Sequence, residues 1–244
     1  NRSYFFRDKN TDVLVGFSNT YRSIIERELD VLRSIGLVPS QKHTEVFLTA
    51  KEIGWARNFV SSHGLSHEKK IITVNPCSSV KIKNWGIDNF SLLCKKLILE
   101  GDIQIILTCP LKEIDNIASI IKLSPEVEVF SGSLRQVMGL INESDLVIGN
   151  DSGPAHISQA LDIPSLTIKG NATLSVFYDP DLAKDKHYVF NKEVYCRDLF
   201  QTQCMSSIDP VTNDSFCDTM TCLDLSVDEV SAKALDLLKF VDKK

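Results

Sequence analysis

The chain lacks an excess of positive charge. Of its 244 residues, 27 are Lys or Arg and 32 are Asp or Glu, so the formal net charge is −5. No segment is rich in Lys or Arg. Proteins that bind nucleic acid carry a basic patch for its phosphate backbone. Nucleic acid is therefore excluded as an expected partner.

Long apolar runs are also absent. No run approaches the roughly 20 residues that span a bilayer, and the N-terminus lacks the basic and then apolar pattern of a signal peptide. We therefore expect a cytoplasmic protein with at most peripheral membrane contact. The chain starts at Asn1 rather than Met, so we interpret its start as a cut, and the missing signal excludes little. Its 43% hydrophobic residues can form a sizeable core in one large or two modest domains.

The seven cysteines include no Cys-x-x-Cys pair, the spacing of typical zinc sites. Three lie in apolar surroundings, where a thiol acts as a small hydrophobe: Cys77, Cys94 and Cys109. The other four gather in a late polar segment: Cys196, Cys204, Cys217 and Cys222. Zinc, disulfides and reduced thiols remain open for these four. Reduced thiols are favoured because a reducing cytoplasm does not preserve disulfides, and we expect no metal.

Apolar periodicity predicts alternating strands and helices. The predicted strands cover residues 13–17, 46–48, 71–74, 103–107, 127–130, 146–148 and 165–168. The predicted helices cover about 24–35, 50–63, 89–100, 113–123, 134–142, 154–161 and 226–238. Two of these helices start with a capping box, at Ser133 with Gln136 and at Ser226 with Glu229. This alternation is typical of an α/β fold with a doubly wound, mainly parallel sheet.

The same pattern predicts three segments. Residues 1–66 are interpreted as part of an N-terminal α/β domain with a linker, since the polar stretch 61–70 contains Gly64. Residues 67–225 form the Rossmann-like domain. Residues 226–244 form a C-terminal helix, which we expect to pack back on the N-terminal domain.

The most informative stretch is the turn between the strand at 146–148 and the helix at 154–161. Gly149 and Gly153 let the backbone approach a ligand, and amides around Ser152 point outward at the positive end of the helix dipole. An anion such as a diphosphate fits there, with Asp151 and His156 beside it. The alternative is a helix capped by Asp151 or Ser152, with His156 packed in the core.

Ligands of doubly wound folds bind beyond the carboxyl ends of the strands, which draws attention to two further loops. Ser78, Ser79 and Lys83 follow the strand at 71–74 and suit a diphosphate, although a solvated loop is the alternative. Glu113 follows the strand at 103–107 and can accept hydrogen bonds from ribose hydroxyls, or simply favour the start of its helix. Residues 131–134, which include Ser133, lie where a flat base can lodge.

Taken together, the motifs from about residue 71 to 240 resemble the bacterial glycosyltransferase family that includes the ADP-heptose:lipopolysaccharide heptosyltransferases. The matching motifs are Pro76-x-Ser78-Ser79, Lys83-x-Trp85, Ser133-Leu134, Asn150-Asp151-Ser152-Gly153-Pro154-x-His156 and Ala160-Leu161-x-x-Pro164. The resemblance implies a GT-B architecture, in which two Rossmann-like domains face each other. This chain would hold the second, donor-binding domain and part of the first.

The resemblance also implies roles for single residues. Ser78, Ser79 and Lys83 would contact the donor diphosphate, as would the backbone of Ser152 and Gly153. Three further roles follow: Asp151 would hold sugar hydroxyls, His156 would position the diphosphate end, and Glu113 would hold the ribose. Transfer would invert the anomeric centre, with ADP-heptose as donor, a lipopolysaccharide-core or similar saccharide as acceptor, and no obligatory cation. A lipid-linked acceptor would place the enzyme at the inner face of the cytoplasmic membrane.

Some positions depart from the family pattern. Cys77 stands where the family usually has Gly, and Lys169 replaces an aromatic residue, which adds a cation beside the expected pocket. The family's base lies on an N-terminal loop that nothing here matches, and Asp8 and Asp12 do not fill that role. The catalytic residue is therefore unknown. A non-catalytic sugar-nucleotide-binding module and a sugar-nucleotide epimerase on a GT-B scaffold remain alternatives.

Overall fold

A computed structural model provides the structure of the chain. It describes residues 24–40, 42–79, 81–170, 186–190, 192, 194, 207–208, 215–217 and 220–239. The chain divides into two compact units. The smaller comprises residues 1–43, 171–182 and 194–205, and within it helix α1 (Ile24–Ser34) is described. The larger comprises residues 44–170, 183–193 and 206–244 and contains the sheet.

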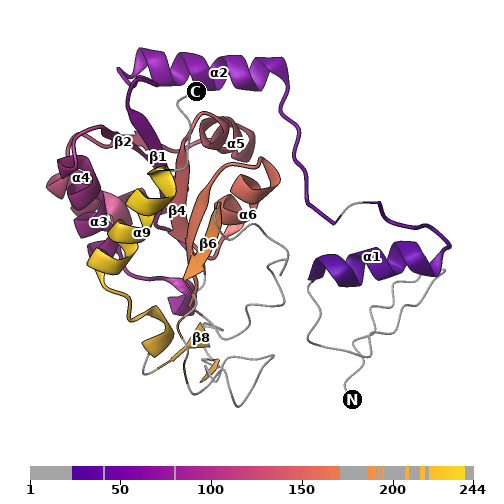
Figure 1. Cartoon of the computed structure of the whole chain (residues 1–244). Coiled ribbons are helices and arrows are strands. Elements are labelled where there is room, and N and C mark those ends of the chain that lie inside the picture. Colours follow the sequence, from indigo (N-terminus) through magenta and orange to yellow (C-terminus); the bar gives the residue numbers. More distant parts are fainter. Residues whose placement is uncertain are drawn as a thin grey trace. The chain divides into compact units, whose positions relative to one another are not determined.

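Six parallel strands form the sheet of the larger unit in the order β3-β2-β1-β4-β5-β6 (Figure 1). They are β1 (Lys70–Asn75), β2 (Ile103–Thr108), β3 (Glu128–Phe130), β4 (Leu146–Asn150), β5 (Ser165–Ile168) and β6 (His187–Phe190). Val74 of β1 lies between Leu107 of β2 and Ile148 of β4. The predicted doubly wound parallel sheet is confirmed.

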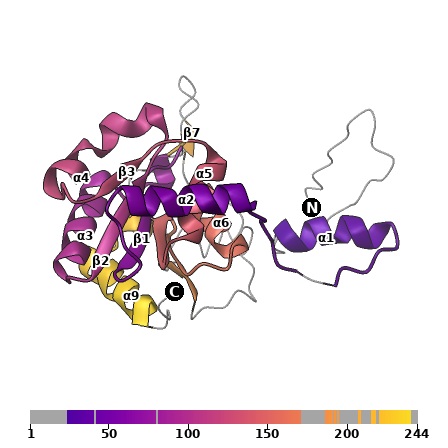
Figure 2. The ribbon, with the colours of Figure 1, turned by 90° about the horizontal axis from the view of Figure 1, so that it is seen from above.

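Helices cover this sheet (Figures 1 and 2). One group comprises α3 (Ile87–Leu99), α4 (Ala118–Leu123) and α9 (Val227–Lys239), in which α3 contacts the other two. The second group comprises α2 (Ala50–Ser62), α5 (Leu134–Asn142) and α6 (Gly153–Ala160), in which α5 contacts the other two. Shorter elements are η1 (Lys81–Lys83), η2 (Leu111–Ile117), η3 (Thr221–Leu223), and the antiparallel pair β7 (Ser207–Ile208) and β8 (Ser215–Phe216).

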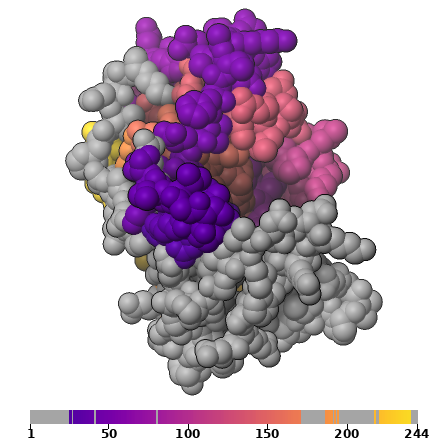
Figure 3. Space-filling model, turned by 90° about the vertical axis from the view of Figure 1, so that its right-hand side faces the viewer, coloured from indigo at the N-terminus to yellow at the C-terminus, as the bar shows by residue number. Residues whose placement is uncertain are grey.

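Apolar side chains of α2 hold it on the sheet, across one end of the larger unit at the top of Figures 1 and 3. Phe59 and Val60 are buried in one cluster with Ile71 of β1 and Leu140 of α5. Phe59 also meets Phe130 edge to face, with ring centroids 5.3 Å apart. Burying each such side chain contributes roughly 1.5–3 kcal/mol. This packing fixes α2 to the sheet although it precedes β1 in the chain.

Both predicted capping boxes are present. Ser133 accepts a hydrogen bond from the Gln136 amide at the start of α5, and Gln136 Oε1 accepts one from the Ser133 amide. Ser226 and Glu229 make the same reciprocal pair before α9. The sequence therefore predicts where these two helices begin.

The structure corrects three secondary-structure predictions. The strand at 46–48 is wrong, because this segment joins no sheet and Val46 donates instead to the Ala160 carbonyl, 3.2 Å away. The helix predicted at 113–123 is instead the 3-10 helix η2 followed by α4. The Glu113 amide donates to the Pro110 carbonyl three residues earlier, which is the hydrogen-bond pattern of a 3-10 helix. Strand β6 was not predicted, because it begins with polar His187 and its other three residues are only half-buried, so its sequence is not an apolar run. The strand predicted at 13–17 lies outside the described residues.

The predicted division of the chain into three segments, after residues 66 and 225, stays a prediction. Helix α2, on the N-terminal side of the division after residue 66, packs on α5 of the larger unit. Helix α9 packs on α3, where Asp228 pairs with Lys96. Cys94 and Cys109 are buried, as expected for small hydrophobes. Cys196 and Cys204 lie outside the described residues.

Candidate anion-binding site at the carboxyl edge of the sheet

The topology of the sheet defines where a ligand would bind. Strand β1 lies between β2 and β4, so the connections from β1 and β4 leave toward opposite sides of the sheet. Ligands of doubly wound folds bind at such a switch point, beyond the carboxyl ends of the strands. The loops after Asn75 of β1 and Asn150 of β4 meet there, and both were predicted to contribute to the site.

Asn150 ties these two loops together. Its side chain is fully buried. Its amide group donates to the Pro76 carbonyl at 2.7 Å, and its oxygen accepts from the Trp85 amide at 3.0 Å. A buried amide with satisfied donor and acceptor fixes a single geometry. Asn150 was quoted in the sequence motif but was not predicted as a site residue.

Asp151 lies at the centre of a cluster of basic groups. Lys83 Nζ of η1 is 2.8 Å from Asp151 Oδ2, and Lys169 Nζ is 3.8 Å from the same oxygen. His156 Nε2 of α6 is 3.6 Å from Asp151 Oδ1. The exposed fraction of the side chain is 2% for Asp151, 1% for Lys169 and 21% for Lys83. The structure thus brings together Lys83, Asp151 and His156, as predicted from their loops.

The electrostatics of this cluster favour an anion. Burial acts to raise the pKa of Asp151, but the hydrogen bond from His156 and the charges of Lys169 and Lys83 outweigh it and hold that pKa well below its ordinary value. The carboxylate therefore stays ionised at neutral pH. One carboxylate thus faces two ammonium groups at this edge of the sheet.

At the start of α6 the candidate backbone donor is the Gly153 amide, because Pro154 has no N–H and the Ala155 amide donates to the Ser152 carbonyl at 3.1 Å. Ser152 occupies the N-cap position, but its side chain makes no capping hydrogen bond and instead donates to Asn75 Oδ1 and to the Asn150 carbonyl. The alternative in which Ser152 caps the helix is therefore wrong. Gly153 is exposed, and a Cβ there would meet nothing within 4 Å. A helix N-terminus open in this way can bind an anion through its amides.

Gly149 has a different role from the predicted one. A Cβ at Gly149 would lie 2.7 Å from the Asn75 carbonyl oxygen of the neighbouring strand. The glycine therefore permits the close pairing of β4 with β1 rather than the approach of a ligand. Gly153 alone keeps the predicted role as a point of open access.

The loops after β1 and β2 also converge. Ser78 is half-buried and Ser79 is exposed. Glu113 on η2 accepts a hydrogen bond from Asn116 at 2.6 Å. Burial, Cys109 and the charge of Glu113 raise the pKa of the Cys77 thiol to about 12, which places Glu113 near the ends of both strands.

Ser133 stands apart from the Asp151 cluster. It follows β3, which is separated from β4 by β2 and β1. Its hydroxyl donates to Gln136 Oε1 at 2.9 Å within the capping box. The observed role of Ser133 is to cap α5, and its contact with a ligand stays a prediction.

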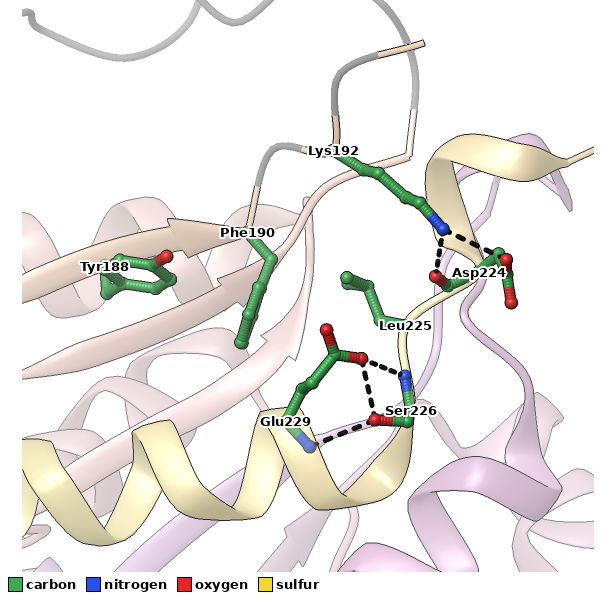
Figure 4. A pocket seen from close by; sticks show the side chains of 7 residues that line it. All are labelled: Tyr188, Phe190, Lys192, Asp224, Leu225, Ser226 and Glu229. Atoms are coloured by element: carbon green, nitrogen blue, oxygen red, sulfur yellow. Dashed lines mark hydrogen bonds and ion pairs between the residues drawn. The ribbon is translucent and has the colours of Figure 1, made fainter.

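A cavity of about 480 Å³ lies between β6 and the start of α9 (Figure 4). It is lined by Tyr188, Phe190, Lys192, Asp224, Leu225, Ser226 and Glu229, none of which was predicted as a site residue. Lys192 bonds there to the carbonyl and the carboxylate of Asp224 (Figure 4). The Leu225 carbonyl accepts from Trp85 Nε1 at 3.0 Å, so the cavity neighbours the loop that carries Lys83.

Within the described part of the chain, no group of three or more His, Cys, Asp or Glu side chains could hold a metal ion. Nor does that part contain a helix with the length and apolar character needed to cross a bilayer.

The strand order defines a Rossmann-like domain, and the lysines at its carboxyl edge make the switch point a candidate anion site. The chain belongs to glycosyltransferase family 9 (heptosyltransferase), whose sequence profile matches residues 17–207. It is 29% identical over 164 residues to lipopolysaccharide heptosyltransferase 3 of Escherichia coli K12, covering 64% of this chain and 46% of that protein. The chain thus spans less than half of this relative.

Two solved structures share the fold. A family 9 glycosyl transferase from Veillonella parvula superposes with a TM-score of 0.68 at 18% identity, covering 89% of this chain and 60% of that one. The E. coli ADP-heptose lps heptosyltransferase II superposes with a TM-score of 0.60 at 18% identity, covering 83% and 56%. These likenesses support the assignment of the sheet to the GT-B class.

Proposed function

We propose that the β1/β4 edge binds the diphosphate of a nucleotide sugar, and that the protein containing this chain transfers the sugar to a saccharide acceptor. The proposed donor is ADP-heptose, and the proposed acceptor is lipopolysaccharide core or a similar saccharide. Membership of family 9 supports the reaction class. The name of the E. coli structural neighbour supports the donor. A lipid-linked acceptor would place the reaction at the inner face of the cytoplasmic membrane, with peripheral contact only.

The observation that carries this proposal is the pair of lysine ammonium groups around Asp151 beside the start of α6. Lys83 is the lysine that retains exposed surface, so its ammonium can reach a phosphate. At the start of α6, Gly153 leaves room for a ligand beside its amide. Ammonium groups and helix amides are the donors that phosphates use in proteins.

The same groups would serve the chemical step. As the glycosidic bond to the donor breaks, negative charge grows on the departing nucleoside diphosphate. Lys83 and the α6 amides would stabilise that charge because they are already fixed in place. We propose that this replaces an obligatory metal ion. Inversion requires a base that deprotonates the acceptor hydroxyl, and we assign that base to no residue of this chain.

Asp151 is better suited to positioning than to the base. Its carboxylate is 2% exposed, and its oxygens face Lys83, Lys169 and His156. Its low pKa also makes it a weak proton acceptor. Its contact with sugar hydroxyls stays a prediction, as do the diphosphate contacts of Ser78 and Ser79, the Glu113 contact with ribose, and the role of His156 at the diphosphate end.

Calorimetric titration with ADP, AMP and ADP-heptose tests the donor site. Because a hydrogen bond to a charged group contributes about 1.5–3 kcal/mol, Lys83→Ala should weaken ADP binding by about 10- to 100-fold. His156→Ala should weaken it less. The matched control is Lys122→Ala in the last turn of α4, an exposed lysine outside the site. Unchanged ADP affinity in Lys83→Ala would contradict the assignment.

Transfer is tested with the full-length protein. Mass spectrometry after incubation with ADP-heptose and a lipopolysaccharide-core acceptor should detect a product enlarged by one heptose. Donor binding without product would favour the sugar-nucleotide-binding module. Conversion of the donor to an isomer without acceptor would favour the epimerase.

A further inference from the structure

The cavity between β6 and the start of α9 has no part in the proposed function. Its volume of about 480 Å³ lies within the range of about 300–1,000 Å³ that is usual for small-molecule sites. Tyr188 and Phe190 are two residues apart on β6, so both rings face the same side of the strand. Their centroids are 5.1 Å apart in an edge-to-face arrangement. Glu229, in the first turn of α9, lines the same cavity (Figure 4).

The ammonium groups at this cavity are already paired with carboxylates. Lys192 Nζ donates to the Asp224 carbonyl at 2.7 Å and to the Asp224 carboxylate at 3.0 Å. Lys233 Nζ is 3.1 Å from Asp236 Oδ2 and lies 4.6 Å from the centroid of the Tyr188 ring. An anionic ligand would therefore compete with existing ion pairs, and a cationic ligand would approach two ammonium groups. These contacts favour an uncharged ligand.

Glu229 offers an open hydrogen-bond acceptor. Its Oε2 accepts from the Ser226 amide at 2.8 Å and from the Ser226 hydroxyl at 2.7 Å. Its Oε1 accepts no hydrogen bond from any residue that the structure describes, and Figure 4 shows this oxygen pointing into the cavity beside Phe190. The hydroxyl and the amide of Ser226 hold the pKa of Glu229 below its ordinary value, so the carboxylate is ionised at neutral pH. An ionised carboxylate only accepts hydrogen bonds, so it suits a donor such as a hydroxyl.

We propose that the cavity binds one ring of an uncharged saccharide, with a sugar hydroxyl donating to Glu229 Oε1 and the C–H face of the sugar against Phe190. A sugar ring presents C–H groups on its faces and hydroxyls at its rim. The face of an aromatic ring carries partial negative charge, which attracts such C–H groups. A cavity that combines two aromatic rings with an ionised acceptor meets both requirements.

Trp85 connects this cavity to the candidate anion site. Its indole Nε1 donates to the Leu225 carbonyl at the cavity wall at 3.0 Å, and its backbone amide donates to Asn150 Oδ1 at 3.0 Å. A saccharide bound here would thus lie beside the loop that carries Lys83. The inference rests on the proposed function, because that reaction supplies two saccharides, the acceptor and the sugar of the donor. The chemistry of the cavity suits either one.

Proton–nitrogen NMR of the isotope-labelled chain tests the cavity. The Trp85 indole N–H reports on the cavity wall, and the indole of Trp55, which packs on Phe59 and Phe130, is the internal reference. One titration uses the lipid-free core oligosaccharide of lipopolysaccharide without nucleotide, and a second compares ADP-heptose with ADP. The Trp85 signal should move with the oligosaccharide if the cavity takes the acceptor, or further with ADP-heptose than with ADP if it takes the donor sugar. Absence of both responses would overturn the inference.

Glu229→Gln isolates the oxygen that faces the cavity. Gln136 forms the same capping box at the start of α5, so glutamine can keep the start of α9 intact. Its amide oxygen has to accept from Ser226, which turns the NH₂ group toward the cavity and replaces an acceptor by a donor. Affinity for the saccharide that moves the Trp85 signal should fall by about 10-fold or more, while the midpoint of urea unfolding stays near that of the parent. Equal saccharide affinity in the two proteins would contradict the role of Glu229 and with it the inference.

Two further variants complete the test. Phe190→Leu keeps an apolar side chain but removes the flat ring, so it should also weaken saccharide binding, and parent-like affinity would refute the inference even where Glu229→Gln does not fold. Glu126→Gln, at an exposed position before β3, is the matched control and should bind as the parent does. A parent protein that binds ADP but shows neither Trp85 response would refute this inference alone. A Trp85 response to the oligosaccharide without any ADP binding would refute the proposed function alone.

Discussion

Replacing Asp151 by Asn should strongly destabilise the larger unit. Asn has the same shape as Asp, so the change removes the negative charge and leaves the packing intact. Lys83, which is 21% exposed, can turn its ammonium toward water. Lys169 is 1% exposed and held after β5, so its ammonium would stay buried and lose the Asp151 carboxylate that lies 3.8 Å away. The stability loss should therefore come mainly from Lys169.

Two estimates bound the size of this loss. Removing one partner of a buried ion pair costs about 3–5 kcal/mol. Lys169 can instead lose its proton, and with an ordinary lysine pKa of about 10.4 this costs at most about 4.6 kcal/mol at pH 7 and about 2 kcal/mol at pH 9. We expect a loss of about 3–5 kcal/mol at pH 7 that shrinks as the pH rises.

The direction of this pH dependence follows from the charge on Lys169 in the Asp151→Asn variant. Without the Asp151 carboxylate, the pKa of the buried Lys169 should be lower than in the parent protein, so the penalty is full at low pH and fades as the pH rises. The lowered pKa of Asp151 in the parent protein adds no slope here. Its stabilising contribution is already complete above about pH 4.

Urea unfolding at pH 7 and pH 9, followed by circular dichroism, measures both quantities. The control is Asp228→Asn, since the Asp228 side chain is 84% exposed in its pair with Lys96 and should contribute less than about 0.5 kcal/mol. The double variant Asp151→Asn/Lys169→Met should regain stability because no cation remains stranded. A loss below about 1 kcal/mol at pH 7, or a double variant as unstable as the single one, would refute the reasoning.

Three further predictions concern other parts of the larger unit. Gly149→Ala should lower the free energy of unfolding in urea by about 1–3 kcal/mol, because the new Cβ would lie 2.7 Å from the Asn75 carbonyl oxygen. Gly153→Ala is the control and should cost far less, because a Cβ there would meet nothing within 4 Å. The pKa of Glu52 is lowered to about 2 by its hydrogen-bonded ion pair with Arg135 of α5 and its capping contacts with Thr49. The contribution of Glu52 to folding stability is therefore complete above about pH 4.5 and disappears as the pH falls through 2. Glu52→Gln should thus be less stable than the parent at pH 6 and equal to it below pH 2. Cys77, with a thiol pKa of about 12, should resist iodoacetamide at pH 8, and rapid alkylation in peptide mass spectrometry would contradict this.

Much of the fold could be predicted because its signals are local. Apolar runs predicted five of the six strands in the sheet, and Ser133 and Ser226 predicted the starts of α5 and α9 from their own side chains. Strand β6 was missed because its four residues are defined by pairing with β5. The division of the helix predicted at 113–123 was missed because it depends on a hydrogen bond from the Glu113 amide to the Pro110 carbonyl. Pro110 precedes the apolar pattern from which the helix was predicted.

The candidate site was predictable to the level of loops. A parallel sheet brings the carboxyl ends of its strands to one edge, so Lys83 and the Gly153-Pro154 bend were expected to meet. Lys83 bonds to Asp151, two residues before Gly153. The sequence could not show where a side chain beyond a strand end points. Lys169 was therefore noted only as an added cation, and its burial against Asp151 depends on the geometry of β5.

Three consecutive residues, Asn150, Asp151 and Ser152, hold the edge of the candidate site through different contacts. Asn150 holds the loop after β1, Asp151 gathers the basic groups, and Ser152 donates to Asn75 at the end of β1. Ser152 is engaged with β1 rather than with the helix, which fixes the position of the start of α6. Groups fixed before a ligand arrives need little reorganisation as charge develops. These contacts among polar side chains therefore give the candidate anion site a framework that is in place before a ligand binds.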